Sequence, residues 1–550
     1  MKRLRRILWA ILAMWGGQWS VAIGSGITGT PHDLSASGGS ACRYCHTQHR
    51  IVASKPLWNH ELSTAVYRIY QSTSLDADVG QPTGASKLCL SCHDGTVALS
   101  ATIQGGTNEG VPTYIQPGTK NLGTDLSDDH PVSFAYSGSL ASRDPQLRPP
   151  QLLPPELQLD QYSELQCTTC HDPHDNQFGD FLVMDNQGSQ MCVSCHDLTG
   201  WATAIHQTAS AVVADADDPY LQMSAYTTMT SAACLNCHRP HSAGGRQRLL
   251  HFASSAENCL NCHNGSMAID MRASLGKRSS HDVRRYEGIH DIRESPMLAP
   301  RHVDCSDCHN PHEAREGQAA APAVPGALRG VSGVTIAGDI ATAASFEYEV
   351  CFKCHGDAPS RVTSPITRQI TQTNTRLEFD PANPSFHPVA GPGGNMDVPS
   401  LLPGFTPASR IGCTDCHNSD DPASGRGPHG SRHPALLAYR YETADNTPES
   451  DSAYELCYQC HSRNSILANE SFPEHDKHLN EQTPCSACHD PHGISNAQGN
   501  IRNNSHLINF DISIVNADTE TGRLEFEDEG TFRGRCFLTC HGVKHSPESY

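Results

Sequence analysis

Residues 485–492 read Cys485-Ser-Ala-Cys488-His489-Asp-Pro-His492, and the first five positions of this stretch recur along the whole chain. The pattern Cys-x-x-Cys-His occurs eleven times. The copies are Cys42/Cys45/His46, Cys89/Cys92/His93, Cys167/Cys170/His171, Cys192/Cys195/His196, Cys234/Cys237/His238, Cys259/Cys262/His263, Cys305/Cys308/His309, Cys351/Cys354/His355, Cys413/Cys416/His417, Cys457/Cys460/His461 and Cys485/Cys488/His489. A twelfth, longer version, Cys536/Cys540/His541, has one additional residue between its cysteines. These twelve motifs contain all 24 cysteines of the 550-residue chain.

Cys-x-x-Cys-His is the pattern of c-type haem attachment, and chance would supply roughly 0.06 matches in a chain of this composition. Disulfide bonds do not require a histidine after every second cysteine. Zinc held by pairs of Cys-x-x-Cys motifs also leaves that histidine without a role. We therefore expect about twelve covalently attached haem c groups, with the 24 cysteines as attachment residues and the twelve motif histidines as iron ligands.

The spacing of the motif predicts a short helix at many attachment sites. Cysteines at i and i+3 and a histidine at i+4 lie on one helical face, where a single porphyrin meets all three. In the twelfth motif the histidine falls about 140° from the first cysteine, so haem attachment there requires a local distortion of the helix. Between the motifs the chain is rich in Pro, Gly, Ala and Ser, most clearly at 141–160, 314–340 and 381–408. We expect these segments to be loops.

The expected fold is therefore mostly irregular with short α-helices, and the haem groups supply much of its core. Only 37% of the residues are hydrophobic, which is little for a conventional core in a chain of this length. One late β-hairpin is predicted, because apolar and polar residues alternate over 508–514 and apolar residues return at 524–526 after a polar turn.

The twelve motifs form six pairs, which we call doublets. The first motif of a doublet usually continues to another histidine three residues after its own, as His489 continues to His492. In the fifth doublet His429 follows His417 by twelve residues, and we interpret it as the same histidine displaced by an insertion. The predicted divisions are a signal peptide at 1–22 and doublets at 23–115, 116–200, 201–275, 276–365, 366–465 and 466–550, the last with the C-terminal hairpin.

Twenty of the 32 histidines remain after the motif histidines are assigned. A second axial histidine closes the iron to substrates and suits electron transfer, whereas an open position allows chemistry on a substrate. Each doublet offers one spare histidine upstream and one shortly after its first motif. These expected second ligands are His32 and His49, His130 and His174, His206 and His241, His281 and His312, His387 and His429, and His478 or His475 with His492. His60 and His506 are the next candidates.

A histidine three residues after a motif histidine cannot easily reach the opposite face of its own porphyrin. We therefore expect it to ligate a neighbouring haem, which would hold adjacent haem groups close together. The other surplus histidines have no assigned role in this minimal scheme; they are His251, His290, His302, His433 and His545.

The beginning of the chain predicts export. Four basic residues within 2–6 precede a short apolar stretch at 7–15, and small residues follow at 20–22, as in a secretory signal peptide. Nine apolar residues are fewer than the ~20 that a membrane-spanning helix needs. We expect a protein of the periplasm or the cell surface that is not an integral membrane protein after cleavage. The net charge of −20 argues against a nucleic-acid partner, which requires clustered Lys and Arg.

The chain resembles the multihaem c-type cytochromes of the doubled Cys-x-x-Cys-His motif family, found in bacteria that respire metals or other extracellular acceptors. The resemblance rests on the Cys-x-x-Cys-His-Asp-Pro-His units, on Asp129-His130-Pro131-Val132 and on the ending from Gly534-Arg535-Cys536 to Tyr550. It extends over nearly all of the chain after the signal peptide. It implies a multihaem cytochrome c scaffold that carries electrons in the periplasm, across the outer membrane or at the cell surface.

Two main functions follow from these observations. The favoured one is electron transport along about twelve bis-histidine haem groups, with no catalytic residue. Its partners would be other redox proteins, such as cytochromes or an outer-membrane barrel, or an extracellular electron acceptor. The alternative is a multihaem oxidoreductase with one open haem that acts on a small nitrogen or sulfur oxyanion. A third interpretation, a structural subunit of a haem filament or of a barrel, overlaps with electron transport.

Overall fold

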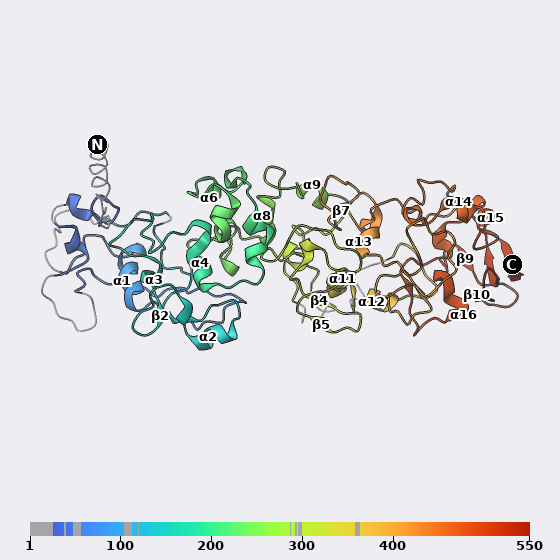
Figure 1. Ribbon diagram of the computed structural model, residues 1–550, viewed down its shortest axis with the longest axis horizontal. Helices are drawn as coiled ribbons and strands as arrows, with labels where there is room; N and C mark the ends of the chain where they lie inside the picture. Colours follow the sequence, from blue (N-terminus) through green and yellow to red (C-terminus); the bar gives the residue numbers. More distant parts are fainter. Residues whose placement is uncertain are drawn as a thin grey trace, which may run out of the picture. The chain divides into compact units, whose positions relative to one another are not determined.

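We describe the fold from a computed structural model of the chain. The described residues are 26–37, 40–47, 57–103, 113–118, 120–286, 288–291, 294, 300–357 and 364–550. They form two compact units, one from the described parts of Met1–Leu198 with Cys237–His251, the other from those of Thr199–Asn236 with Phe252–Tyr550 (Figure 1). The predicted signal peptide and His49 lie outside the described residues.

The predicted helices at the attachment sites are present. Each of the eleven Cys-x-x-Cys-His motifs has at least its first cysteine in an α-helix or a 3₁₀ turn. The α-helices are α1 (Gly84–His93), α3 (Cys167–Cys170), α4 (Gln190–Cys195), α8 (Ser255–Leu260), α10 (Cys305–Cys308), α11 (Glu347–His355) and α13 (Cys413–Cys416). The 3₁₀ turns are η2 (Ala41–Tyr44), η7 (Ala233–Asn236), η11 (Cys457–Gln459) and η12 (Cys485–Ala487). The shortest of these helices, such as α3, α10 and α13, contain only the two cysteines and the residues between them.

The other elements are equally short, and irregular segments join them, as predicted. The remaining α-helices are α2 (Gly138–Arg143), α5 (Ile205–Thr208), α6 (Pro219–Gln222), α7 (Met229–Ala232), α9 (Arg272–Leu275), α12 (Thr375–Glu378), α14 (Arg463–Leu467), α15 (His475–Asn480) and α16 (Ile501–Asn504). The remaining 3₁₀ turns are η1 (Leu34–Ser37), η3 (Pro150–Leu152), η4 (Gln187–Ser189), η5 (Trp201–Thr203), η6 (Val213–Asp215), η8 (Gln247–Leu249), η9 (Gly326–Leu328), η10 (Pro434–Leu436) and η13 (Ser505–Leu507). Among the described helices, none is both long and apolar enough to cross a membrane.

The described residues contain four antiparallel pairs of two-residue strands. They are β1 (Phe134–Ala135) with β2 (Glu164–Leu165), β3 (Ser279–Ser280) with β7 (Gly430–Ser431), β4 (Gly333–Val334) with β5 (Ile340–Ala341), and β6 (Ser385–Phe386) with β8 (Gly493–Ile494). All but β4–β5 join segments that are far apart in the sequence. Two of these pairs, β3–β7 and β6–β8, lie directly beside histidines of two different doublets. They therefore set the positions of those histidines.

A four-stranded antiparallel sheet forms near the C-terminus, where β10 lies beside α16 (Figure 1). Its strands are β9 (Val515–Asn516), β10 (Glu525–Asp528), β11 (Gly534–Cys540) and β12 (Val543–Ser549). The order is β10-β11-β12, and β9 also pairs with β11.

The predicted hairpin between 508–514 and 524–526 is wrong in its partners. The segment around Phe510 instead hydrogen-bonds with residues 367–369, and the Asp511 side chain accepts bonds from Ser513 that turn the chain before β9. Phe526 pairs with Cys536 on β11. Alternation of apolar residues identified buried segments correctly, but it did not identify which segments pair.

The apolar core of the described residues is divided into small clusters. One contains Val213, Leu221 and Met229, and another contains Phe510, Phe526 and Leu538. Attachment cysteines lie at the edges of most clusters, among them Cys195, Cys262, Cys305, Cys308, Cys413, Cys457, Cys485, Cys488, Cys536 and Cys540. Groups bonded to these cysteines would extend the small clusters with their own apolar surface.

Candidate haem-binding sites

The motif histidines are held in one orientation by their Nδ1 atoms. In six of them Nδ1 lies 2.7–2.9 Å from a backbone carbonyl oxygen. The pairs are His93 with Lys120, His171 with Asp180, His238 with Arg248, His309 with Ala327, His417 with Ala435 and His489 with His506. A carbonyl can only accept, so Nδ1 carries the proton and Nε2 is left with a lone pair. This is the usual arrangement of a metal-binding histidine.

The accepting carbonyls come from a repeated backbone turn. Asp180, Arg248, Ala435 and His506 all have φ values between 45° and 61°, the left-handed region that non-glycine residues rarely adopt. The residue that follows each of them is also left-handed, and the next one forms a β-bridge with the motif histidine. A left-handed conformation of this kind costs of order 1–3 kcal/mol per residue. At each of these sites it allows the backbone carbonyl to accept the hydrogen bond that orients the imidazole.

A second histidine faces the motif histidine at nearly every site where ring contacts are described. Eight such pairs have ring centres 5.9–6.5 Å apart. They are His32–His93, His46–His174, His130–His196, His171–His241, His206–His263, His281–His355, His309–His429 and His417–His492. A ninth pair, His475–His489, lies at 6.4 Å.

These separations suit an iron between the two rings. Two metal–imidazole bonds of about 2 Å, with the distance from each nitrogen to its ring centre, place the centres roughly 6 Å apart. Cysteines and an unprotonated Nε2 lie on one side, and a second imidazole lies opposite. The described residues therefore fit haem c, with the motif cysteines as its attachment points and the two imidazoles as axial ligands.

The facing histidines follow a rule that the sequence did not reveal. The second motif of a doublet faces the upstream histidine of its own doublet, as His93 faces His32. The first motif instead faces the downstream histidine of the next doublet, as His46 faces His174 and His417 faces His492. The displaced His429 takes the same position opposite His309.

Short strand pairs place both kinds of histidine side by side. Ser280 and Gly430 pair across β3 and β7, directly before His281 and directly after His429. The same geometry recurs across β6 and β8, next to His387 and His492. The upstream histidine then donates from Nδ1 to the carbonyl of the proline before the downstream histidine, at 3.2 Å for His206 with Pro311 and 2.9 Å for His281 with Pro428.

Burial lowers the pKa of several of the paired imidazoles. It is the main cause that lowers the pKa of His417 and His429 to about 4, and the facing histidine adds to the effect. Burial and then His489 lower the pKa of His475 to about 3. Neutral imidazoles are the form that binds a metal, so these rings are in the ligating state at neutral pH.

The attachment cysteines of successive motifs lie next to one another. Between doublets, the thiols of Cys89 and Cys167 share a hydrogen bond, as do Cys259 and Cys305, Cys351 and Cys413, and Cys457 and Cys485. That hydrogen bond, followed by burial, raises the pKa of one thiol in each pair.

Within doublets, cysteines of the two motifs also lie close enough for their charges to interact. The pairs are Cys45 with Cys92, Cys170 with Cys195, Cys308 with Cys351, Cys416 with Cys460 and Cys488 with Cys536. In a protein with haem c attached, the sulfur atoms of these thiols would be thioether sulfurs bonded to the haem groups. Motifs 1–4 in one unit and 6–12 in the other are thus each an unbroken series.

All 24 predicted attachment cysteines lie among the described residues. Those of the first motif are exposed, and the others are partly buried. In the eighth motif, Cys351 and Cys354 both lie on α11. Cys351 shares a hydrogen bond with Cys413 of the next doublet, and both cysteines lie near Cys308 of their own doublet. Burial, then Cys351 and more weakly Cys354, raise the pKa of the Cys308 thiol to about 12. Cys354 is thus placed where the two motifs of the fourth doublet meet.

Three further predicted ligands are placed less simply. His387 lies near His461, whose pKa is lowered to about 4, first by burial and then by His387. The ring of His312 lies against Trp201, with 5.9 Å between ring centres. His478 faces His545 rather than His489.

His60 and His506 are not brought opposite a motif histidine in the described contacts. The two ring nitrogens of His60 each lie 2.9 Å from a carbonyl oxygen, of Glu61 and Ala98. His506 supplies its backbone carbonyl to His489, and its ring lies 3.0 Å from the Ser505 hydroxyl. An apolar pair such as Leu507-Ile508 follows five of the six first motifs, and it is the sequence signal that marks this turn.

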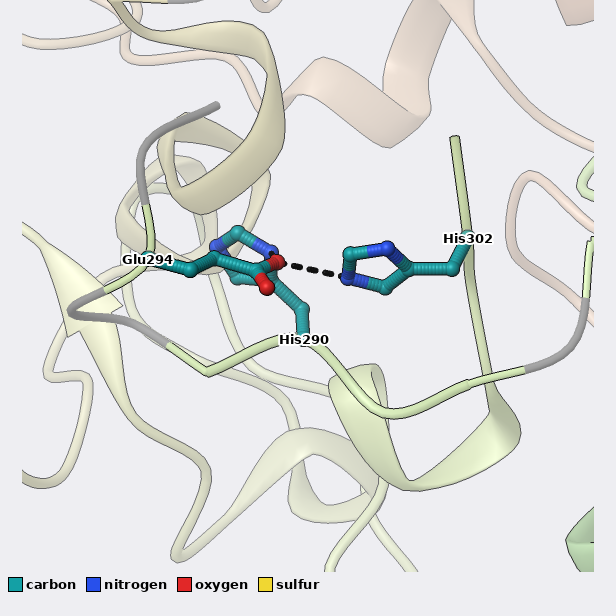
Figure 2. A group of neighbouring side chains, drawn as sticks. All are labelled: His290, Glu294 and His302. Atoms are coloured by element: carbon teal, nitrogen blue, oxygen red, sulfur yellow. Dashed lines mark ion pairs between the residues drawn. The ribbon is translucent and has the colours of Figure 1, made fainter. Parts of the chain in front are cut away.

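Sequence reasoning also left two histidines without a role that the structure brings together. His290 and His302 meet the carboxylate of Glu294, and Figure 2 shows the three side chains pointing toward one another. They lie apart from the paired imidazoles described above.

The twelfth motif lies on a strand rather than a helix. Cys536 and Cys540 are both on β11, and His541 occupies the two-residue turn to β12 with a φ of 48°. His541 uses Nε2, which lies 2.9 and 3.1 Å from the two carboxylate oxygens of Asp445. In six of the other motifs the histidine is anchored through Nδ1 instead.

A different histidine shares the face of the twelfth pair of cysteines. Residues two apart on a strand, and directly paired residues on neighbouring strands, point to the same side. Leu538 therefore shares a face with Cys540 and with its cross-strand partner His545. The ring of His545 lies 6.3 Å from that of His478, with 25° between the ring planes.

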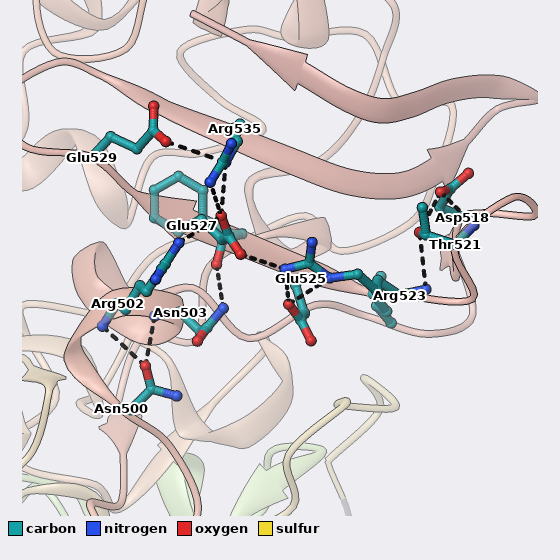
Figure 3. A network of polar contacts seen from close by, with 12 residues as sticks. Asn500, Arg502, Asn503, Asp518, Thr521, Arg523, Glu525, Glu527, Glu529 and Arg535 are labelled. Carbon is teal, nitrogen blue, oxygen red and sulfur yellow. Dashed lines mark hydrogen bonds and ion pairs between the residues drawn. The ribbon is translucent and has the colours of Figure 1, made fainter.

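The opposite face of this sheet carries a network of charged groups (Figure 3). The Glu527 carboxylate is nearly buried and accepts from Arg502 at 3.0 Å, from Arg535 at 2.7 Å and from Arg523. Arg523 also lies over the ring of Phe537, 3.5 Å from its centre. These contacts hold β10 to β11, and so position the strand that carries Cys536 and Cys540.

Comparison with known proteins agrees with the motif pattern. Residues 161–200, 227–268 and 406–465 match the family model described as the doubled CXXCH motif. These regions cover the second doublet, the third doublet and the fifth doublet. No curated protein matches the chain. The chain thus carries the doubled CXXCH motif of the multihaem c-type cytochromes, which supports covalently bound haem c.

The Glu527 network predicts a pH-dependent stability of the C-terminal sheet. Hydrogen bonds, that from Arg523 first, lower the pKa of Glu527 to about 2, against an unfolded value of about 4.3. A lowered carboxyl pKa stabilises the fold above pH ~4.3, and the contribution is lost as the pH falls toward 2. Glu527→Gln is expected to speed amide hydrogen exchange in β10 and β11 about tenfold at pH 7, and to have little effect near pH 2.

Glu529→Gln is the matched control, because the Glu529 side chain is 43% exposed and contacts only Arg535, at 3.2 Å, in this network. Its effect on exchange should stay below about twofold. Equal effects of the two variants at pH 7 would show that the network does not stabilise the sheet.

Proposed function

We propose that the protein is an exported electron-transfer protein that carries about twelve bis-histidine haem c groups. The two series of neighbouring attachment cysteines, in motifs 1–4 and in motifs 6–12, are the observation that carries this proposal, because they keep successive redox groups close. Each haem c would supply a one-electron couple of its iron. No residue of the chain is assigned a catalytic role in this proposal.

The side chains of the chain would perform three tasks in this function. The cysteines fix each group to a helix or strand, and the carbonyl-anchored Nδ1 atoms orient the proximal imidazoles. The facing histidines close the second axial position. Because the facing histidine of a first motif comes from the next doublet, each such ligand also fastens two doublets to each other. Rigid, closed sites with little reorganisation suit electron transfer better than substrate chemistry.

The purified holoprotein tests this function directly. We expect a haem-to-protein ratio of about twelve by the pyridine haemochrome assay, a resting spectrum of low-spin haem only, and full reduction by about twelve electron equivalents. A high-spin resting haem that binds nitrite or sulfite would favour the oxidoreductase alternative. A low ratio would remove haem groups from the proposal.

The cross-doublet ligands can be tested with one substitution. His429→Ala removes the imidazole that faces His309 at 5.9 Å, so one haem should become high-spin while the haem content stays unchanged. His433→Ala, four residues away, is the control and should leave the spectrum unchanged. A fully low-spin His429→Ala protein would mean that His429 is not an axial ligand.

We further propose that the haem at the twelfth motif uses His545 and His478 as axial ligands rather than His541. Three observations support this: His545 shares a face with the attachment strand's Leu538 and Cys540, it lies opposite His478, and the Nε2 of His541 is occupied by Asp445. The neighbouring Cys488 of the eleventh motif lies close to Cys536 and Cys540. The twelfth group would thus continue the series.

His545→Ala and His541→Ala distinguish the two ligand schemes. The first should convert one haem to high-spin, whereas the second should leave all haem groups low-spin. Electron paramagnetic resonance of the oxidised proteins, normalised to haem content, measures this. A high-spin signal in His541→Ala with an unchanged His545→Ala protein would contradict the proposed assignment.

The proposed location is the periplasm or the cell surface, and the proposed partners are other redox proteins or an extracellular acceptor. The signal-like beginning of the chain and its acidic composition support this. Fractionation of cells into periplasm, membranes and culture supernatant, followed by haem staining, would identify the compartment.

A further inference from the structure

The side chains of His290, Glu294 and His302 form a cluster of potential metal ligands. One ligand atom from each side chain lies within 4.8 Å of the other two. Oε1 of Glu294 lies 2.6 Å from Nε2 of His302 and contacts Nδ1 of His290 (Figure 2). The side chains of His290 and His302 are only 1% and 9% exposed, and that of Glu294 is 26% exposed.

Two of these groups point acceptor atoms at each other. Nδ1 of His302 donates to the carbonyl of Pro300 at 2.7 Å, so in the neutral ring Nε2 carries a lone pair. That lone pair faces a carboxylate oxygen, which also carries only lone pairs. Nδ1 of His290 meets the same carboxylate oxygen. A cation bound among the three side chains would stabilise the contact between the two buried acceptors, Oε1 of Glu294 and Nε2 of His302.

The arrangement is unlike the haem sites. The rings of His290 and His302 have their centres 5.5 Å apart, closer than the 5.9–6.5 Å of the facing pairs. The Glu294 carboxylate contacts both rings, so it occupies the space that a porphyrin would need. Neither histidine follows an attachment cysteine or faces a motif histidine in the described contacts.

We propose that His290, Glu294 and His302 bind one divalent transition-metal ion of the zinc type, separate from the haem irons. Two imidazole nitrogens and one carboxylate oxygen form the donor set of three-ligand zinc sites that keep a position open. Imidazole ligands also suit ferrous and cupric ions, but not calcium or magnesium.

The open position would accept an anion. Glu294 and His302 line an open cavity of about 520 Å³, together with Arg284, Arg285 and Arg301. The guanidinium groups of Arg285 and Arg301 lie 5.2 and 5.7 Å from the ring centre of Tyr286, which also lines the cavity. Three arginines beside a metal ion favour a small oxyanion such as phosphate as the fourth ligand.

The site is also tied to the seventh attachment helix. The backbone N–H of His290 donates to Asp307 Oδ1 at 2.8 Å. Asp307 is a buried residue of α10 whose carboxylate also accepts from the backbone N–H of the N-cap residue Asp304. Lys353 donates to the Asp307 carbonyl. A metal bound at His290 and His302 would therefore fix the segment before Cys305 against the helix that carries it.

Metal analysis of the holoprotein tests the proposal. After treatment with a chelator, which leaves covalently attached haem in place, the protein is dialysed against micromolar ZnCl₂ and its zinc and iron are measured by mass spectrometry. We expect one zinc per twelve haem irons in the unsubstituted protein. Glu294→Gln and His302→Ala should each weaken zinc binding at least about tenfold.

His433→Ala is the control and should keep full zinc binding. All three variants should retain the haem content and the low-spin spectrum, which separates loss of this site from failure of the haem assignment. Zinc binding that is absent, or unchanged in Glu294→Gln and His302→Ala, would overturn the proposal. So would a new high-spin haem in His302→Ala, because His302 would then be a haem ligand.

Discussion

The hydrogen bond from Nδ1 of a motif histidine to a backbone carbonyl is the constraint on which the rest of the structure depends. It fixes the tautomer, so that Nε2 is available, and it fixes the plane of the ring. Asp180, Arg248, Ala435 and His506 adopt unfavourable left-handed backbone to supply the acceptor. Everything opposite the ring, including the facing imidazole and the strand pairs beside it, must then fit one direction of approach.

That constraint explains why so little regular secondary structure is enough. A helix of four residues, such as α10 or α13, needs only to present two thiols and end where the histidine begins. The loops between the helices have a structural role. They place the carbonyls that accept from the motif histidines, and the second histidines that face them, at positions set by the motif. The apolar clusters remain small and are arranged around the attachment cysteines.

Much of the site could be predicted from the sequence because the motif determines its own geometry. The helical turn at the attachment sites follows from the i, i+3, i+4 spacing, and the downstream histidine of a doublet could not serve its own group. Which haem it does serve depends on contacts between residues more than 100 positions apart, such as His309 with His429. The spacing of the motifs contains no information on those contacts.

The errors of the sequence predictions have similar physical causes. His475 and His478 lie three residues apart on α15, and only the packing of that helix places one toward His489 and the other toward His545. His506 was expected to be a ligand, but its contribution is a backbone carbonyl, which is common to every residue type. The late sheet pairs β11 with β12, and the polar strand β12 gave no apolar alternation to detect.

The position of His475 has a wider meaning. In the other first motifs with a described partner, the facing imidazole comes from the following doublet, whereas His475 belongs to the same doublet as His489. In the first, second, fourth and fifth doublets, the first motif thus takes its facing histidine from the next doublet. In the sixth doublet, His475 supplies the imidazole that faces His489 from within the same doublet. It makes that doublet the counterpart of the atypical capping repeats found in repeat proteins.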